Sequence, residues 1–129
     1  MRTVSVATLA TLVLVGCATD PKPAAEPASF DLRVTAQIAP KFVTPIAGGC
    51  DSNGVSKGSP VLVRDESNTT VGAGALGGGS LQPDGACHFY ANITVAEGRE
   101  FYEVTIGDRA PATVPADRAR TGFSLSFGY

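Results

Sequence analysis

The sequence has no tryptophan, one histidine, one methionine and three cysteines among 129 residues. A single histidine and so few thiols disfavour a metal site built from imidazole and thiolate ligands. Charged residues make up only 17% of the chain, and 10 basic residues face 12 acidic ones with no basic run. The chain therefore lacks the basic stripe that a nucleic-acid backbone would require, and nucleic acid is not an expected partner.

The N-terminal segment is typical of an exported lipoprotein precursor. An apolar run covers residues 4–15, which is too short to span a bilayer and has the form of a leader peptide. It ends in the motif LVGC at residues 14–17, which resembles the lipobox of bacterial lipoproteins, where a small residue precedes a lipid-modified cysteine. We expect a signal peptide over residues 1–16, cleavage between Gly16 and Cys17, and acylation of Cys17. The alternative is an ordinary secretory leader with an incidental cysteine.

A proline-rich tether is expected to follow the lipidated cysteine and to occupy residues 17–29. From residue 18 it reads ATDPKPAAEPAS, which has no apolar periodicity. Such a segment favours extended polyproline II and would hold a domain roughly 35 to 40 Å from the lipid surface. The sequence thus predicts anchoring to the cell membrane through palmitate-type chains, on the extracytoplasmic side, with the membrane and an envelope protein as partners.

Apolar and polar residues alternate with period two from Phe30 onward, which indicates strands with one buried and one solvated face. Turn-forming glycine, asparagine and aspartate separate the runs, and only residues 116–120 are expected to form a helical turn. The sequence predicts an all-β domain over residues 30–129, a single small antiparallel β-sandwich of about seven strands. The alternating runs are 30–38, 61–63, 71–75, 87–95, 102–106, 112–114 and 123–127.

The stretch from Gly58 resembles the prealbumin-like sandwich modules typified by CnaB and carboxypeptidase-regulatory domains. The resemblance is carried by GSPVLVRDESNTTVGAGAL, CHFYANITV and FYEVTIG. CnaB modules often carry a lysine-to-asparagine isopeptide bond, which is not expected here because the last strand, TGFSLSFGY, has no asparagine. Together with the lipobox, tether and cysteine pair, the FYEV strand is also similar to small lipoproteins of mycobacteria and other high-GC bacteria. That resemblance implies no particular activity.

Cysteine usage favours one disulfide. With Cys17 acylated, Cys50 and Cys87 remain, and a pair of cysteines in an exported domain most simply forms a bridge. The expected bridge joins a loop before the second strand of the sandwich to the start of the CHFYANITV strand. A metal site or a reactive thiol is the alternative, and each lacks the further ligands or the neighbouring base that it requires.

Other groups that could carry chemistry have simpler interpretations. Alternation places His88 on the solvated face of its strand, so we expect an exposed histidine rather than a catalytic base. Residues 51–54 resemble the opening of a calcium loop but lack its closing glutamate, so an Asx turn is expected. The glutamates at 97, 100 and 103 are expected to be solvated charges. The glycine-rich stretch 72–79 lacks the lysine of a phosphate-binding loop.

Three classes of function follow from these observations. The favoured one is a lipid-anchored envelope domain without enzymatic activity or cofactor, which acts by binding or as a structural part. The first alternative is a carrier for an apolar envelope molecule, and the second is an enzyme. An interior filled by Phe30, Phe89, Tyr102, Phe123 and Phe127 would favour the first class, whereas an apolar cavity of several hundred Å³ would favour a carrier.

Overall fold

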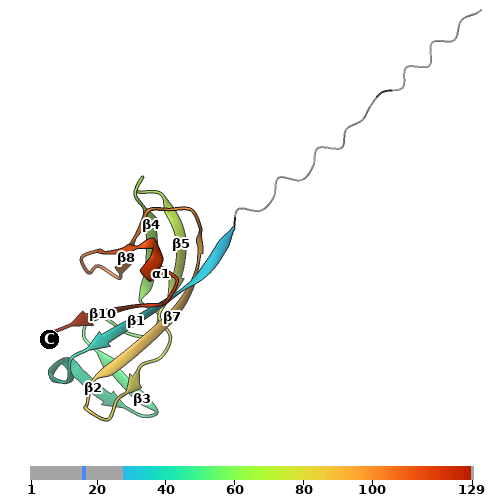
Figure 1. The fold of residues 1–129 in the computed structure, drawn as a ribbon. Helices are drawn as coiled ribbons and strands as arrows, with labels where there is room; N and C mark the ends of the chain where they lie inside the picture. The colour runs from blue at the N-terminus through green and yellow to red at the C-terminus, as the bar shows by residue number, and fades with distance from the viewer. Residues whose placement is uncertain (1–15, 17–27, 129) are drawn as a thin grey trace, which may run out of the picture.

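The alternating runs become β-strands in the computed structural model, which describes Gly16 and residues 28–128 (Figure 1). All seven expected strands and the expected helical turn are present. Three further strands, β2, β3 and β6, bring the number in the described residues to ten rather than seven. In chain order the elements are β1 (Ser29–Ile38), η1 (Pro40–Phe42), β2 (Val43–Ile46), β3 (Gly49–Ser52), β4 (Pro60–Asp65), β5 (Thr70–Ala75), β6 (Ser80–Leu81), β7 (Cys87–Ala96), β8 (Phe101–Ile106), β9 (Ala112–Pro115), α1 (Ala116–Ala119) and β10 (Phe123–Phe127).

Two four-stranded sheets form the layers of a sandwich. The first sheet has the order β10-β1-β7-β6, the second has the order β5-β4-β8-β9, and β2 and β3 form a separate hairpin. One strand pair departs from the expected antiparallel arrangement, because β10 runs parallel to β1, from Val34↔Phe123 to Ile38↔Phe127. The reason lies in the connection: the chain leaves β9 in the second sheet, passes through α1 and enters the first sheet beside β1 in the same direction.

The antiparallel pair β1 and β7 defines the long axis of the domain. It runs for ten residues without a register shift, from Ser29↔Ala96 to Ile38↔Cys87. We call the end near Ala28 and the turns that follow β4 and β7 the proximal pole. The opposite end, formed by η1, β2, β3, β6, the turn after β8 and the end of β10, is the distal pole. Figure 1 shows the β2 and β3 hairpin at this far end of β1.

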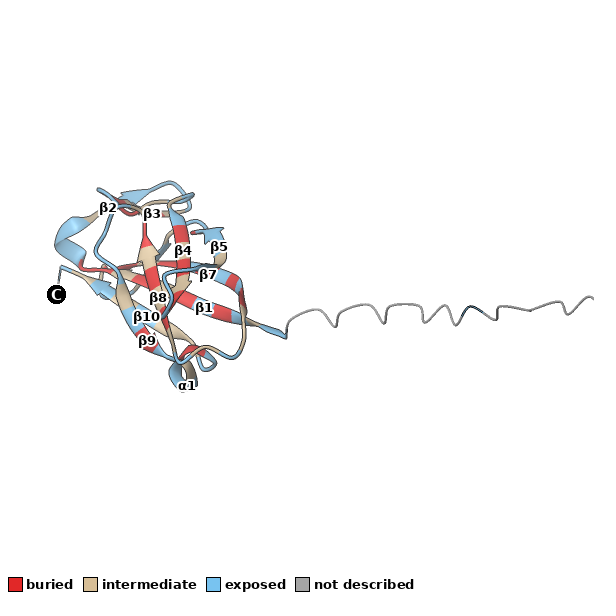
Figure 2. Cartoon of the chain, turned by 90° about the horizontal axis from the view of Figure 1, so that it is seen from above, coloured by how far each residue is buried: buried red, intermediate tan, exposed pale blue. Residues whose placement is uncertain are grey.

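Side chains from β1, β4, β7 and β8 supply most of the core between the sheets. The buried residues of these strands are coloured red in Figure 2. Phe89 and Tyr102 are the largest fully buried side chains. Phe30, Phe123 and Phe127 are only partly buried and pack against the rim of the core. Of the five aromatic residues whose burial would distinguish a filled interior from a cavity, Phe89 and Tyr102 are therefore the two that are fully buried.

Hydrophobic alternation selects the wrong inward face for most of β5. It predicts that residues 71, 73 and 75 face the core, yet Ala73 and Ala75 are exposed. The glycines between them lie against β7 instead: a Cβ atom at Gly72 would be 2.6 Å from Cγ1 of Val95 and 2.8 Å from the carbonyl oxygen of Thr94. Glycine is needed there because the two strands approach too closely for a side chain.

A disulfide between Cys50 and Cys87 attaches the distal hairpin to the first sheet. The two Cα atoms are 6.0 Å apart, and both side chains are buried. The bridge confirms the predicted pairing, although Cys50 lies in β3 rather than in a loop. Gly79 packs between the two segments: the Cys50 N–H donates to its carbonyl oxygen at 3.4 Å, and a Cβ atom there would be 2.6 Å from Sγ of Cys87.

Reduction of this bridge should lower the melting temperature. The disulfide joins two cysteines that are 37 residues apart in sequence. Closing a loop of that length in the unfolded chain stabilises the fold by about 3 to 4 kcal/mol. For a domain of this size we expect a decrease of about 10 °C or more, followed by circular dichroism with and without reductant. The Cys50→Ala/Cys87→Ala variant is the control and should melt at the lower temperature under both conditions. Equal melting temperatures of the oxidised and reduced wild-type chain would contradict a stabilising role.

Candidate functional site

The distal pole contains an apolar hollow of about 180 Å³, which we call the distal pocket. Four segments that are far apart in sequence form its wall: the end of β1 with η1, the end of β3, the turn after β8 and the end of β10. The lining residues are Ile38, Phe42, Ser52, Asn53, Arg109, Phe127 and Gly128.

Local sequence explains how β1, η1 and β10 meet at the pocket. Pro40 ends the strand pattern and begins the single turn of η1, which carries Phe42. The N–H of Ala39 donates to the Phe127 carbonyl oxygen at 3.0 Å, which joins the ends of β1 and β10. Gly128 has a φ of +83°, and a Cβ atom there would overlap the ring of Phe42. The ring therefore lies directly against the backbone at this point.

Arg109 is the charged residue in the lining, and neighbouring groups hold its guanidinium in place. Its Cζ lies 5.5 Å from the centroid of the Phe127 ring, a cation–π arrangement, and Nη2 donates to the Asn53 carbonyl oxygen at 3.4 Å. Across residues 28–128 the ion pairs are Arg99 with Asp65 and Arg120 with Glu97, so Arg109 has no carboxylate partner there. A guanidinium has five N–H donors, and among the described residues one hydrogen bond from Arg109 is found, the one to Asn53.

The end of β3 and the bend that follows it at residues 53 and 54 lie beside Arg109. The Asp51 carboxylate accepts a hydrogen bond from the Ser52 N–H at 2.8 Å, and the Ser52 hydroxyl donates to the Val55 carbonyl oxygen at 2.5 Å. At Gly54, with a φ of +89°, a Cβ atom would be 2.8 Å from Nη2 of Arg109. Asp51 and Ser52 belong to β3 and the chain bends only at Asn53 and Gly54. The Asx turn expected over residues 51–54 does not form, because the Asp51 carboxylate accepts from the next residue and not from the residue two positions on. Within the described ranges no three acidic, histidine or cysteine side chains gather in a way that could hold a metal ion.

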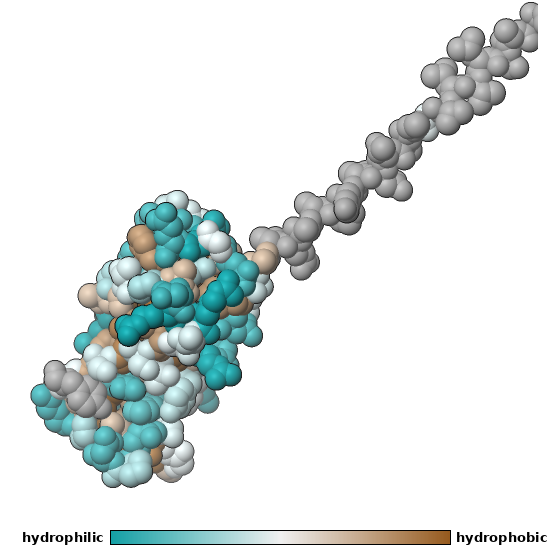
Figure 3. Space-filling model, viewed as in Figure 1, coloured by the Kyte–Doolittle hydropathy of each residue, from teal (hydrophilic) through white to brown (hydrophobic). Residues whose placement is uncertain are grey.

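Exposed apolar side chains gather at the same pole. Phe42 is 53% exposed in η1, Ile46 is 54% exposed at the tip of the hairpin, and Leu81 is 45% exposed in β6. The face of the molecule in Figure 3 is mostly hydrophilic, with apolar areas scattered over it. The fourth large exposed apolar residue, Tyr90, lies on the outer face of the first sheet.

His88 lies on the outer face of β7, as predicted. Its Nδ1 is 3.4 Å from the hydroxyl of Tyr90, and its register partners on the two flanking strands are Gln37 and Ser80. These neighbours are neutral, and none is a carboxylate that would orient an imidazole as a general base. The structure therefore brings no acid and base pair together at this histidine.

The three glutamates serve different local roles. Glu97 forms an ion pair with Arg120 at 3.0 Å, so it is not simply a solvated charge. Glu100 is exposed, and Glu103 lies half-buried on β8.

A second hollow of about 330 Å³ lies along α1 and the start of β10, and its lining is mainly polar and includes Arg118.

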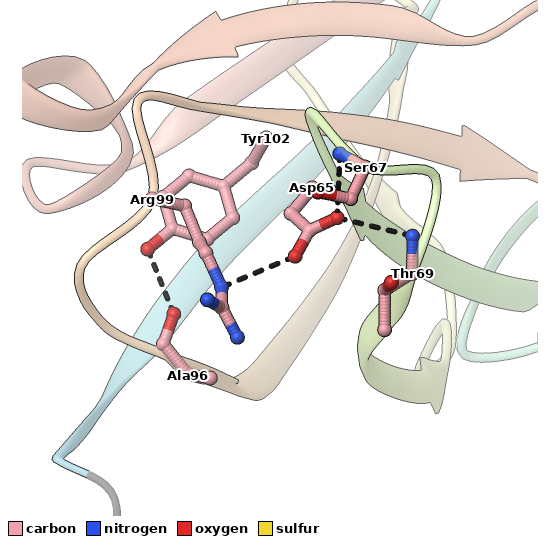
Figure 4. A network of polar contacts seen from close by, with 6 residues as sticks. All are labelled: Asp65, Ser67, Thr69, Ala96, Arg99 and Tyr102. Carbon is pink, nitrogen blue, oxygen red and sulfur yellow. Dashed lines mark hydrogen bonds and ion pairs between the residues drawn. The ribbon is translucent and has the colours of Figure 1, made fainter.

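A buried carboxylate at the proximal pole was not anticipated from the sequence. Asp65 is 5% exposed, and its Oδ1 accepts hydrogen bonds from the N–H groups of Ser67 at 2.9 Å and Thr69 at 3.0 Å (Figure 4). Its Oδ2 lies 3.2 Å from Nε of Arg99 as an ion pair. Oδ1 thus stabilises the turn after β4, and Oδ2 links that turn to the turn after β7, which contains Arg99. The alternation in PVLVRD, which turns Asp65 inward after Val61 and Val63, is the signal that would have revealed it.

Tyr102 lies beside this turn and closes the proximal pole. Its hydroxyl donates to the Ala96 carbonyl oxygen at 2.8 Å (Figure 4). Burial raises the pKa of the Tyr102 phenol above its ordinary value, against the opposing effects of a backbone hydrogen bond and of the charges of Arg120 and Arg99. A buried, hydrogen-bonded tyrosine at this position is a structural group.

Comparison with protein-family models, with curated proteins and with solved structures finds no match for this chain. No helix in the described part of the chain is long and apolar enough to cross a membrane. At the predicted cleavage site Gly16 is exposed. Cys17 lies outside the described residues, as do the rest of the predicted leader and the tether up to residue 27.

The raised pKa of Tyr102 predicts that part of the stability is lost in alkali. A phenol whose pKa is higher in the folded than in the unfolded chain stabilises the fold fully below pH about 10, and this contribution falls as pH rises through the folded pKa. Tyr102→Phe removes this pH-dependent contribution to the free energy of unfolding, together with a hydrogen bond worth about 1 kcal/mol. The difference in unfolding free energy between wild type and variant, measured with urea, should therefore shrink from pH 8 to pH 11. For Tyr90→Phe, the exposed control, the difference should stay near zero. A constant difference for Tyr102→Phe would rule out the assigned pKa direction.

Proposed function

We propose that this chain is a lipid-anchored lipoprotein of the cell envelope whose sandwich acts by binding, with the distal pole as its working surface. The observation that carries the proposal is that the chain enters the domain at one end of β1 and the distal pocket lies at the other end. The Ala28 carbonyl oxygen accepts a hydrogen bond from the Glu97 N–H at 2.9 Å, which fixes the chain where it enters the proximal pole. Ile38, at the other end of the same strand, lines the distal pocket.

The length of β1 supports this assignment. Ten residues of antiparallel strand extend for about 30 Å at roughly 3.4 Å per residue. A proline-rich tether that ends at residue 28, before β1 begins at Ser29, adds roughly 35 Å when extended. Anchored through Cys17, the domain would present its distal pole to the envelope rather than to the lipid surface.

The character of the distal pole supports binding at this surface. Three of the four large apolar side chains that are exposed in the described residues, Phe42, Ile46 and Leu81, belong to it. Single exposed apolar residues are ordinary on protein surfaces, whereas their concentration at one end is typical of an interaction site.

The chemistry of the pocket favours binding over catalysis or transport. Ser52 supplies a hydroxyl to the lining but donates it to Val55, and the described lining residues include no histidine, cysteine or carboxylate that could act as a base. Phe89 and Tyr102 fill the centre of the interior. A carrier would require that space for its ligand, so the filled interior supports recognition at the surface.

Loss of the cysteine at position 17 should remove the anchor. In cells fed an alkyne analogue of palmitate, we expect the wild-type chain to be labelled and Cys17→Ser to be unlabelled. The reason is that the lipobox has no other cysteine that could form the thioether to the diacylglyceryl group. The variant should also leave the membrane fraction. Cys87→Ser is the matched control, because it removes a cysteine and the disulfide but keeps the acylation site, and it should retain the label. Label on the Cys17→Ser chain would refute the anchoring.

Photocrosslinking can test the orientation of the working surface. A photoreactive residue placed at Ile46, on the exposed tip of the distal hairpin, should form adducts with envelope components in intact cells. The same residue at Glu66, in the exposed turn after β4 at the proximal pole, is the control and should form far fewer. Equal or greater adduct formation from position 66 would show that the distal pole is not the binding surface.

A further inference from the structure

We propose that the distal pocket binds a small carboxylate carried on an apolar body of about the size of a phenyl ring. This inference deepens the proposed function, because it assigns a ligand class to the surface proposed above. It depends on three features of the pocket: its size, its apolar wall and the guanidinium at Arg109.

The volume of the pocket sets the size of the ligand. A cavity of about 150 Å³ holds a benzene ring in a protein interior, and the distal pocket measures about 180 Å³. Phe42, Phe127 and Ile38 supply aromatic and aliphatic surface to the wall. Aromatic side chains of this kind favour a ring that packs edge to face or offset against them. The apolar part of the ligand is therefore a single ring or a branched aliphatic group.

Arg109 sets the charge of the ligand. It is the charged group in the lining, so the ligand carries one negative charge rather than the two or more of a phosphate ester. A planar guanidinium pairs with a carboxylate through two parallel N–H···O bonds, which is the geometry in which arginine binds anions best. The remaining donors of Arg109 are available for this pairing, since its described hydrogen bond uses only Nη2 toward Asn53.

The guanidinium, which is exposed to solvent, also has neighbours that restrict its positions before a ligand arrives. Phe127 lies under it, the Asn53 carbonyl oxygen accepts from it, and the absence of a side chain at Gly54 leaves room for it. A side chain restricted in this way loses less conformational entropy on binding than a free surface arginine. Lys41, whose Nζ lies 5.2 Å from the Phe42 ring centroid, adds positive charge beside the wall and favours an anion further.

Binding of phenylacetate to the full chain in lipid nanodiscs tests the proposal. Saturation-transfer NMR, with empty nanodiscs as the blank, should give a Kd on the order of 1 mM, as expected for a ligand of this size. Phenylacetamide, which has the same shape but no charge, should bind at least tenfold more weakly. Arg109→Gln should weaken phenylacetate binding at least tenfold. Arg118→Gln, which changes an arginine at the second hollow, should leave it unchanged.

A comparison of two carboxylate probes distinguishes the C-terminus of a peptide from a free small acid as the natural ligand. N-acetylphenylalanine presents the carboxylate as the C-terminus of a peptide does, whereas phenylacetate represents a free acid. Tighter binding of N-acetylphenylalanine would assign the pocket to an apolar C-terminal residue, and tighter binding of phenylacetate would assign it to a small acid. Either result supports the proposed ligand chemistry.

Three results would overturn the proposal: no saturation transfer to phenylacetate, equal binding of the amide, or unchanged binding in a folded Arg109→Gln variant. If that variant does not fold, the comparison of acid with amide on the wild-type chain decides. Failure here is distinguishable from failure of the proposed function. Adducts from position 46 without binding of either acid would reject the carboxylate pocket while leaving the distal pole as the working surface.

Discussion

The ten-residue ladder between β1 and β7 is the constraint on which the rest of the molecule depends. It occupies the middle of the first sheet, and alternate residues of both strands supply the inner layer of the core. One end of the ladder holds Ala28 against Glu97, and the other end places Ile38 opposite Cys87. Because a strand pair of this length is stiff, the separation between the entry of the chain and the distal pocket is fixed by the same hydrogen bonds that hold the sheet together.

Much of this architecture could be predicted from the sequence, because period-two burial is a local property. The seven longer runs, the outward position of His88 and the cysteine pair all follow from alternation or composition. Features that depend on distant contacts could not be predicted. β6 has only two residues, too few to show a period, and the inward glycines of β5 are invisible to a hydrophobic pattern because the strand spacing alone requires them. The parallel placement of β10 depends on the route of the chain from β9, which no local pattern encodes.

The candidate site was harder to predict for the same reason. Its walls come from four segments, and each is unremarkable in isolation: Arg109 lies in a turn after β8, where an exposed arginine is ordinary, and Phe42 follows a proline in a segment without alternation. Only the fold shows that the Arg109 guanidinium rests on Phe127 and bonds to Asn53. Asp65, in contrast, was accessible from sequence, because a carboxylate on the inward face of a strand must find donors in the turn that follows.

Charged side chains have different roles at the two poles: at the proximal pole they form ion pairs, and at the distal pole Arg109 faces a pocket. The disulfide explains why the distal pole does not need ion pairs to stay folded. At the proximal pole the carboxylates of Asp65 and Glu97 are paired with arginines, so these charges stabilise the turns around Ala28. The distal hairpin has no such pairs, and the backbone bridge that joins it to the described sandwich is the one between Cys50 and Gly79. The covalent bond to Cys87 takes the place of a longer ladder there. It keeps Asn53, three residues beyond Cys50, close to Arg109, where its carbonyl oxygen accepts one hydrogen bond from the guanidinium and leaves the charge available for a ligand.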